Sequence, residues 1–533
     1  MNDSTTLLLG GRVYTPSSPD ATAMAVSGGT VVWVGQDAPA RALHPDAEVV
    51  DLGGAFVAPA FVDAHVHATS TGLHLTGLDL TAIRSSADLL AAVRGAVVPG
   101  QVLLAHGWDE SSWTEQRLPS RAELDAAAGD TPVYLSRVDV HSALVSSALA
   151  KLAPGVESAA GWSADGPLTR AAHHLVRGAA RDAITRAQRQ EAQRAFLSTA
   201  AARGIVSVHE CAGPDISGEE DFADLLALAD PALPEIVGYW GELNAFDTAR
   251  RLGAHGVAGD LFVDGALGSR TAALTSPYSD EPGTSGSLYA DAAVIADHLV
   301  ACTEVGLQAG FHVIGDAAVG EVIEGFRLAE KQVGQRPLAA RHHRLEHLEM
   351  VTQDQARALA GWGVVASVQP LFDEAWGGDS GMYSERLGAR AAALNPFAQL
   401  AAEGVVLAFG SDAPVTAVDP WAAVRAAVHH HTPEARLSAR AAFTAHTRAG
   451  HRAAGVNDGV TGSLVPGAPA HYAIWDAADL VVATADSRVQ RWSTDPRSGV
   501  PPLPRLEPGA SLPRCLRTVR GGTVIYDEFT PAA

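Results

Sequence analysis

Residues 55–67 read AFVAPAFVDAHVH, an apolar run that ends in two histidines separated by one residue. In a β-strand, residues two apart point to the same side, so His65 and His67 project together from the end of a strand. A metal ion requires ligands that converge in this way. A His-x-His pair also arises by chance, and on this pair alone the alternative is two hydrogen-bonded surface histidines.

Further polar residues stand at the ends of apolar runs toward the C-terminus. These residues are His312 in 307–313, His347 in 343–348, and Asp412 after 405–410. If the runs are parallel strands of a (β/α)₈ barrel, their C-terminal ends converge on the face where active sites lie. Histidines combined with a carboxylate suit Zn²⁺, although other divalent metals accept the same ligands. Such a metal lowers the pKa of a bound water to about 7 and supplies a nucleophile at neutral pH.

The central part of the chain alternates apolar runs typical of strands with alanine-rich stretches typical of helices. The runs are 55–66, 101–105, 132–136, 204–210, 261–264, 307–313, 343–347, 363–369 and 405–411, and two of the helical stretches are 177–202 and 290–305. Repeated units of this kind imply a buried parallel sheet. We expect an α/β fold with a (β/α)₈ TIM-like barrel over residues 56–455. An insertion after the first barrel strand, at about 70–190, is rich in Trp, His and Ser and interrupts the barrel rhythm.

The two ends of the chain predict short antiparallel strands. Residues 1–55 contain β-branched runs separated by Gly-Gly pairs, and the runs at 470–475 and 516–526 contain another Gly-Gly turn signal. Chain termini often lie close together in space. We therefore expect residues 1–55 and 456–533 to form one composite β-sandwich domain.

Charge and cysteine content exclude several classes of protein. The chain has 38 Lys and Arg against 60 Asp and Glu, a formal net charge of −22, so nucleic acid and anionic membranes are unlikely partners. Three cysteines do not form a disulfide framework. The N-terminus lacks the pattern of a signal peptide, and no apolar stretch reaches the length of a membrane span. These features predict a cytoplasmic protein.

The order and spacing of these residues resemble a known superfamily. The matching segments are His65-x-His67, His312, His347 and Asp412, with 107–113 (GWDESSW), 264–271 (DGALGSRT) and 312–318 (HVIGDAA). They resemble the amidohydrolase superfamily, and in particular its YtcJ-like and N-substituted formamide deformylase-like branch (amidohydrolase family 3). The resemblance implies a metal-dependent hydrolase that cuts a non-peptide C–N bond in a small molecule, such as an N-formyl or N-acyl amine.

The resemblance also implies roles for individual residues. His65, His67 and Asp412 would bind a buried Zn²⁺, and His312 and His347 would bind a second one. If the chain holds a single metal, His347 would instead polarise the substrate carbonyl. Asp412 would act as general base on the metal-bound water and then pass the proton to the leaving amine.

One position departs from the family pattern. Many members carry a lysine four residues before the Asp-Gly of the DGALGSRT motif, and that lysine is carboxylated and bridges two metals. This chain has Asp260 there, which is several Å shorter and is not expected to bridge from the same place. Glu210, at the end of the strand 205–209, is the candidate replacement ligand, because some members use a carboxylate at the end of the third strand. The alternatives are that Glu210 supports a histidine ligand or that the site is mononuclear. Cys211 is expected on the other side of that strand, in the core.

Four further residues are candidates for substrate binding. Arg270 could pair with a substrate carboxylate, or equally with a carboxylate of the protein itself. Trp108, Trp113 and His141 lie in the insertion and could line a lid over the pocket. For the two tryptophans, packing in a separate small core is an equal alternative.

Two other functions fit parts of the pattern. The same site could open a cyclic amide or deaminate an amine. A protein of another class, a non-catalytic scaffold with this fold, would typically have lost metal ligands, whereas this chain retains all five of the main ones. The expected partner is a small-molecule amide substrate, and the resemblance suggests a homodimer.

Overall fold

The computed structural model describes residues 5–113, 115, 117–138, 141–482 and 501–530. The chain forms two compact units. Unit 1 combines Met1–His67 with Leu197–Ala533, and unit 2 consists of Ala68–Phe196. Unit 2 covers the residues in which the sequence predicts an insertion.

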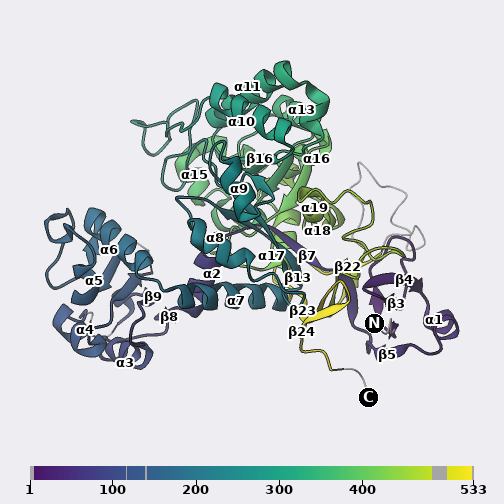
Figure 1. Ribbon diagram of the computed structural model, residues 1–533, viewed down its shortest axis with the longest axis horizontal. Coiled ribbons are helices and arrows are strands. Elements are labelled where there is room, and N and C mark those ends of the chain that lie inside the picture. The colour runs from purple at the N-terminus through teal and green to yellow at the C-terminus, as the bar shows by residue number, and fades with distance from the viewer. Residues whose placement is uncertain (1–4, 114, 116, 139–140, 483–500, 531–533) are drawn as a thin grey trace. The chain divides into compact units, whose positions relative to one another are not determined.

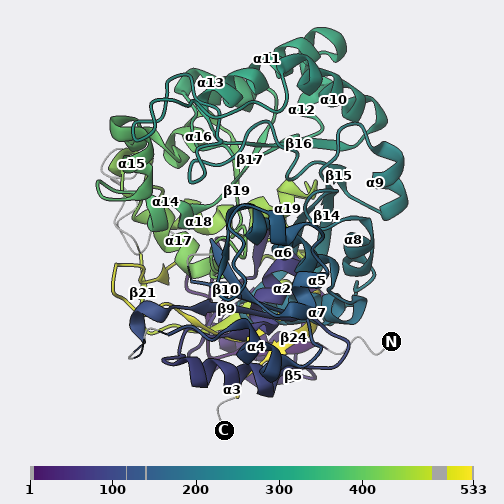
Figure 2. The same cartoon turned by 90° about the vertical axis from the view of Figure 1, so that its left-hand side faces the viewer.

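Unit 1 contains an eight-stranded parallel barrel (Figures 1 and 2). Its strands in order are β7 (Phe61–Val66), β13 (Ile205–Ala212), β14 (Glu235–Trp240), β15 (Gly256–Val257), β16 (Gln308–Val313), β17 (Arg344–His347), β18 (Val365–Val368) and β19 (Val406–Phe409). The first and last strands approach each other. A parallel bridge joins Val66 to Ala413, and the N–H of Asp412 donates to the carbonyl of His65 at 2.8 Å. This confirms the predicted (β/α)₈ fold.

Helices surround the barrel strands (Figure 2). They are α8 (Glu219–Leu226), α9 (Phe246–Leu252), α10 (Ala292–Val305), α11 (Asp316–Val333), α12 (Gln335–Ala339), α13 (Gln353–Gly361), α14 (Pro370–Trp376), α15 (Met382–Leu387), α16 (Phe397–Glu403), α17 (Pro420–Val428), α18 (Ala439–Ala445) and α19 (Arg448–Ala453). The strands are buried along their whole length at β7, β13 and β16, as a sheet covered by helices requires.

Some predicted runs differ from the observed elements. The run 55–66 is two strands, because the chain leaves β6 (Phe56–Pro59) at Ala60 and enters the barrel as β7. The run 261–264 is a loop with a single bridge from Phe262 to His312, and the short β15 takes its place in the barrel. The stretch 177–202 is two helices, α6 (Arg170–Asp182) and α7 (Arg186–Ala202). The sequence reading also missed β14, whose first half is partly exposed.

Both ends of the chain contribute to one pair of sheets. One sheet has the order β4 (Thr30–Gly35), β3 (Ala23–Ser27), β1 (Thr6–Leu9) and β5 (Glu48–Asp51), and the other has β2 (Arg12–Val13), β6, β20 (Tyr472–Asp476), β23 (Arg514–Arg520) and β24 (Thr523–Asp527). A common core joins Leu8 and Val31 from the first end to Ile474 and Val519 from the second. Part of the tail expected in this domain, residues 483–500, lies outside the described residues.

Two Gly-Gly turns from opposite ends of the chain pack against each other. Gly29 has a φ of 77°, and a Cβ built on it would lie 2.6 Å from the carbonyl oxygen of Gly521. A side chain at this position would therefore force the two turns apart. The glycine pairs mark the hairpins predicted at both ends and also allow the two hairpins to meet.

Unit 2 is an α/β unit with its own cores. Its sheet has the order β12 (Leu168–Thr169), β11 (Ser142–Val145), β10 (Val133–Arg137), β9 (Leu103–Trp108) and β8 (Leu78–Asp79). The helices are α2 (Ala68–Thr76), α3 (Ser86–Ala96), α4 (Arg121–Ala128), α5 (Ser147–Lys151), α6 and the first part of α7. Separate apolar clusters form around Trp108 and around Val176.

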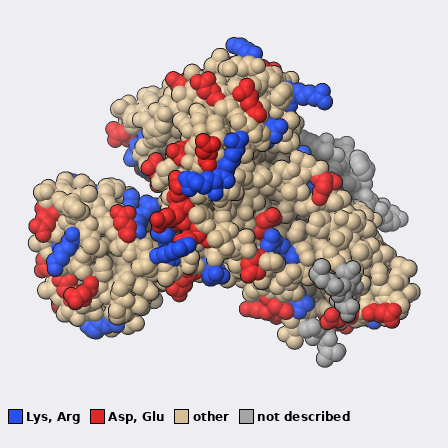
Figure 3. Space-filling model, in the orientation of Figure 1, with Lys and Arg blue, Asp and Glu red and all other residues tan. Residues whose placement is uncertain are grey.

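The three cysteines are buried and none forms a disulfide. Among the residues that the structure describes, no helix combines the length and the apolar character that a membrane span needs. Acidic and basic side chains are interspersed on the face shown in Figure 3.

Candidate metal centre

Four side chains from three parts of the barrel converge at the C-terminal ends of its strands. Nε2 of His67 lies 3.3 Å from Oδ2 of Asp260 and 3.2 Å from Oδ1 of Asp412. Nε2 of His65 lies 3.6 Å from Oδ1 of Asp260 and 3.5 Å from Oδ1 of Asp412. His65 comes from β7 and His67 follows that strand directly, Asp260 comes from the loop after β15, and Asp412 from the residues after β19. The structure thus brings together the predicted His65, His67 and Asp412, and adds Asp260.

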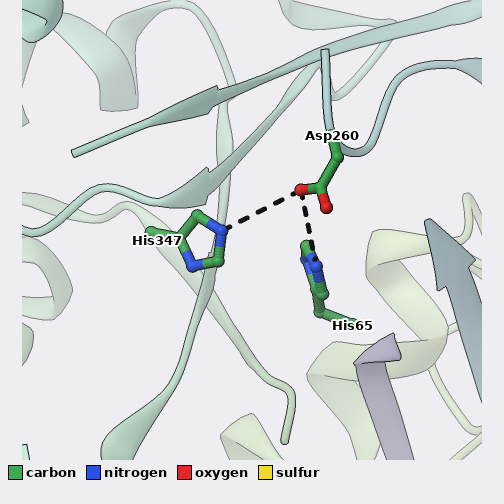
Figure 4. Close-up of side chains that lie close together, drawn as sticks. All are labelled: His65, Asp260 and His347. Atoms are coloured by element: carbon green, nitrogen blue, oxygen red, sulfur yellow. Dashed lines mark ion pairs between the residues drawn. The ribbon is translucent and has the colours of Figure 1, made fainter. Parts of the chain in front are cut away.

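The other two predicted histidines lie beside this cluster. Nε2 of His347 is 4.0 Å from Oδ1 of Asp260, and Figure 4 shows Asp260 between His347 and His65. The ring of His312, from β16, lies 4.5 Å from the ring of His347. Asp260 therefore faces both histidine pairs that the family resemblance assigns to two metals.

Hydrogen bonds on the far ring nitrogens determine which tautomer each histidine presents. Nδ1 of His65 donates to Oε2 of Glu346 at 2.8 Å, and Nδ1 of His347 donates to Oε1 of Gln369 at 2.8 Å. In each neutral ring, the lone pair is then on Nε2 and points into the cluster. Burial lowers the pKa of His347, so its ring is neutral at neutral pH. These two histidines present acceptor nitrogens, as metal ligands must.

The cluster concentrates negative charge in a buried place. Burial opposes ionisation of Asp260 and Asp412, but the neighbouring His65 and His67 outweigh it and lower the pKa of both carboxyls. For the same two histidines, burial lowers the pKa, and neighbouring acidic groups, Asp260 and Asp412 among them, outweigh it and raise the value. Buried carboxylates are stable only when a positive charge accompanies them. The site therefore favours a cation.

Several polar atoms in the cluster are buried and lack a hydrogen bond within the described part of the chain. They include Nε2 of His65, Oδ1 of Asp260, Oδ1 of Asp412 and Nδ1 of His312. Buried polar atoms are otherwise almost always paired. Nitrogen and carboxylate-oxygen donors at this spacing fit a divalent transition metal such as zinc.

A charged network inside the barrel holds the first histidine in place. Nε of Arg344 donates to Oε1 of Glu346 at 2.5 Å, and Nη2 donates to the carbonyl of Ala64 at 2.6 Å. The guanidinium also lies over the ring of Tyr239, 4.3 Å from its centroid. The sequence reading missed Arg344 and Glu346. Their spacing of two residues within the strand that ends at His347 is the signal that could have identified them.

Two carboxyl groups connect the ends of neighbouring strands. Oδ1 of Asp63 accepts the N–H of Ser411 at 2.8 Å, which ties β7 to the residues after β19. Asp264 accepts three backbone N–H groups, from Ala273, Ile314 and Gly315, at 2.8–3.0 Å. Asp264 therefore positions the chain that follows β16, in agreement with a structural role.

Next to the cluster of His65, His67, Asp260 and Asp412 is a cavity of about 260 Å³ with largely apolar walls. The apolar residues that line it are Phe262, Leu267, Ile314, Phe372, Trp376 and Met382. Glu349 also lines it; its Oε2 is buried without a hydrogen-bond partner among the described residues, and burial raises its pKa to about 8. The structure thus places a buried carboxyl group with a raised pKa in an apolar pocket, and the sequence reading did not identify it.

At the position of the family's lysine, the structure favours Asp260 over Glu210 as the residue close to the cluster. β13 is the second barrel strand, and Cys211 is buried inside the barrel behind His65, with its Sγ 3.5 Å from Nδ1 of that histidine. Since neighbouring residues of a strand point to opposite sides, Glu210 points away, and it does not belong to the groups of side chains whose donor atoms could share a metal. Asp260, which the sequence analysis set aside because of its length, reaches the cluster instead.

Of the four predicted substrate-binding residues, Arg270 lies in unit 1 and does not line this cavity, and the other three belong to unit 2. Arg270 pairs with Asp280, with Nη2 and Oδ2 at 2.6 Å, which favours the internal ion pair left open by the sequence. Trp108 and Trp113 are buried in a core of unit 2, where Nε1 of Trp108 donates to the carbonyl of Leu135 at 2.8 Å. His141 is an exposed residue of unit 2. A lid role for these three residues remains a prediction.

Comparison with known proteins identifies a family and several relatives. Residues 48–526 match the amidohydrolase family. The chain is 28% identical to the putative amidohydrolase YtcJ of Bacillus subtilis, covering 72% of this chain and 75% of that protein. It is 24% identical to the N-substituted formamide deformylase of Arthrobacter pascens, covering 88% and 92%. It is also 29% identical to Protein LONG AFTER FAR-RED 3 of Arabidopsis thaliana, covering 88% of each.

Solved structures show the same relationship. An uncharacterised metal-dependent hydrolase from Pyrococcus furiosus superposes with a TM-score of 0.75 at 26% identity, covering 89% of this chain and 99% of that one. A second such hydrolase, from Pyrococcus horikoshii, gives a TM-score of 0.71 at 25% identity, covering 89% and 98%.

Proposed function

Because this chain belongs to the amidohydrolase family, we propose that it is a metal-dependent enzyme that hydrolyses an N-formyl or N-acyl amine with a small apolar group on nitrogen. The general class, a hydrolase acting on carbon–nitrogen bonds, follows from the family and from the relatives with that activity. The substrate and the identity of the metal as zinc are the proposed parts.

The metal would be held by His65, His67, Asp260 and Asp412, with His312 and His347 beside it. A divalent cation in such a site supplies a hydroxide nucleophile at neutral pH and polarises a carbonyl. Asp412 is an ionised carboxylate within this cluster. We assign it to accept the proton of the attacking water and to deliver that proton to the departing amine nitrogen.

His347 has two candidate roles, and its hydrogen bond favours one of them. To stabilise the developing oxyanion by hydrogen bonding, Nε2 would have to carry a proton. Its Nδ1 donates to Gln369, and burial lowers the ring's pKa, so Nε2 carries a lone pair. This supports His347 as a ligand of a second metal over its role as a proton donor to the carbonyl.

The observation that carries the substrate proposal is the apolar cavity beside the metal cluster. At about 260 Å³ it is slightly smaller than the usual range of about 300–1,000 Å³ for ligand pockets. Its aromatic and aliphatic walls favour an apolar substituent. We assign Oε2 of Glu349, which is buried there without a hydrogen bond among the described residues, to one hydrogen bond with the substrate. The relative from Arthrobacter pascens is an N-substituted formamide deformylase, and N-substituted formamides are N-formyl amines with a substituent on nitrogen.

Product analysis tests the proposal. The zinc-loaded protein would be incubated with an N-formyl arylalkylamine, its N-acetyl analogue, a cyclic imide and an aromatic amine. Formate or acetate together with the free amine is expected from the first two compounds, and removal of the metal with a chelator should abolish it. Ring opening of the imide alone would favour a cyclic amide hydrolase, and ammonia from an intact skeleton would favour a deaminase.

Elemental analysis of the purified protein comes before these assays. About one or two equivalents of metal per chain are expected after loading with zinc, iron, manganese or nickel in turn. A protein that binds none of them would contradict the proposed mechanism and favour the scaffold alternative, whose function would not respond to a chelator.

A further inference from the structure

Asp260 stands where related hydrolases have a lysine that must react with carbon dioxide before it can bind metal. We propose that Asp260 is itself the fourth ligand of the primary metal site, so that this chain assembles its metal centre without carbon dioxide or bicarbonate. The inference rests on the proposed function, since it concerns the same metal. It identifies the residue that completes the site.

The spacing of the donor atoms supports a four-ligand site. The four distances that join Nε2 of His65 and of His67 to oxygens of Asp260 and Asp412 are 3.2–3.6 Å. Ligands about 2.1 Å from a tetrahedral zinc ion lie about 3.4 Å from one another. Each of these four pairs therefore has the spacing of two ligands on one tetrahedral ion, and among the described residues Asp260 also forms a candidate metal group with His65 and His347.

The backbone explains how a short side chain reaches the metal. Gly259 has a φ of 90°, and a Cβ built on it would lie 3.1 Å from Cβ of Cys211. Gly241 lies equally close, with its ideal Cβ 3.1 Å from the carbonyl carbon and oxygen of Asp260. These two glycines let the loop that carries Asp260 pack directly onto β13 and the end of β14. A side chain at either glycine would push this loop away from the strands and carry Asp260 away from the cluster.

The lysine content of the chain excludes a carboxylated lysine as the alternative ligand. The sequence contains two lysines, Lys151 and Lys331. Both are exposed; Lys151 ends helix α5 of unit 2, and Lys331 lies in the last turn of helix α11. Neither lines the cavity beside the metal cluster. A carboxylated lysine is therefore not available from within unit 1 at the strand ends.

Other acidic or sulfur ligands near the site are already engaged or face elsewhere. Oε2 of Glu346 accepts hydrogen bonds from His65 and from Arg344. Sγ of Cys211 faces Nδ1 of His65, the nitrogen on the far side of the ring from the cluster. Both lie behind His65, where they can fix its orientation, and Asp260 lies in front of it.

Metal binding in the presence and absence of bicarbonate tests the proposal without any substrate. The protein would be stripped of metal, equilibrated in carbon dioxide-free buffer and titrated with Zn²⁺ against a chromophoric chelator, with bound metal counted by elemental analysis. We expect the same affinity and stoichiometry with and without added bicarbonate. A requirement for bicarbonate would overturn the inference.

Two variants complete the experiment. Asp260→Asn keeps the size of the side chain and is expected to lower zinc affinity by at least about 100-fold, the upper end of the loss seen when a partner of a ligand is removed. Asp316→Asn is the matched control, because Asp316 begins helix α11 and accepts the N–H of Thr275 away from the metal. Circular dichroism would establish that both variants are folded.

The outcomes separate this inference from the proposed function. Folded Asp260→Asn that binds zinc as tightly as the parent would overturn the role of Asp260 and leave the hydrolase proposal intact. Absence of metal binding by the parent chain under every condition would overturn both. If Asp260→Asn does not fold, Asp260→Glu replaces it: a shift in affinity without loss of structure supports direct contact, and an unchanged affinity contradicts it.

Discussion

Two charged clusters lie one behind the other in the barrel, and their hydrogen bonding differs. Around Arg344, a guanidinium, a carboxylate, a hydroxyl and a backbone carbonyl bond one another at 2.5–3.1 Å. Around Asp260 and Asp412, donor atoms stand 3.2–4.0 Å apart, and several have no hydrogen bond among the described residues. His65 belongs to both clusters.

The difference indicates the purpose of each cluster. The Arg344 cluster is electrically and geometrically complete, so it can serve as a support. The Asp260 cluster is complete only when a cation joins it. Through Glu346 the support fixes the tautomer of His65, and so presents the correct nitrogen to the metal.

The largest expected effect is the loss of activity when Asp412 of the Asp260 cluster is replaced. Asp412→Asn removes the group that moves the proton, and kcat should fall by about 10²–10⁴-fold or more. Asp316→Asn should keep the parent kcat. The measurement is steady-state hydrolysis of the substrate found by product analysis, with metal content and circular dichroism in parallel. A near-normal kcat in Asp412→Asn would remove that residue from the mechanism.

Stability should respond most to damage in the Arg344 cluster. Arg344→Met leaves Glu346 buried without its cation, and the free energy of unfolding should fall by about 3–5 kcal/mol. Denaturant unfolding of metal-free protein measures this change. The double variant Arg344→Met with Glu346→Gln should recover part of the loss, because no uncompensated charge remains. Equal stability of Arg344→Met and the parent would mean that the network is not a support.

The dependence of stability on pH should reveal the histidines that are buried in the neutral form. Burial lowers the pKa of His343 to about 3 and of His446 to about 4. Both are depressed from about 6.5, so the unfolded chain binds protons first, and the stability present above pH 6.5 is lost as the pH falls toward 3–4. In His446→Asn this loss between pH 7 and pH 5 should be smaller than in the parent. Urea unfolding at several pH values measures the free energy of unfolding. If it falls equally with pH in both proteins, His446 does not contribute to the loss.

The smallest effect is expected at Glu210. Because it faces away from the metal cluster, Glu210→Gln should leave the number of metal ions per chain and the zinc affinity unchanged. Asp260→Asn provides the contrast in the same titration. A fall in metal content with Glu210→Gln alone would restore Glu210 as a candidate ligand.

Local patterns in the sequence were sufficient for the barrel and for most of the residues that form the candidate metal cluster. His65 and His67 were predictable because alternate residues of a strand share a side, and His312, His347 and Asp412 because parallel strands end on one face. The Gly-Gly pairs predicted the terminal hairpins. Each of these inferences needs only the period of one strand or the spacing within one turn.

The tertiary structure decided the features that depend on distance between elements. Whether Glu210 or Cys211 points into the barrel depends on where β13 lies in it. Whether Asp260 reaches the candidate metal cluster depends on how closely Gly259 and Gly241 let the chain pack. The pairing of Arg270 with Asp280 is likewise a contact across a loop. The length of a side chain predicts whether it reaches a site only when the position of its backbone is known. That position is set by packing between segments that are far apart in the sequence.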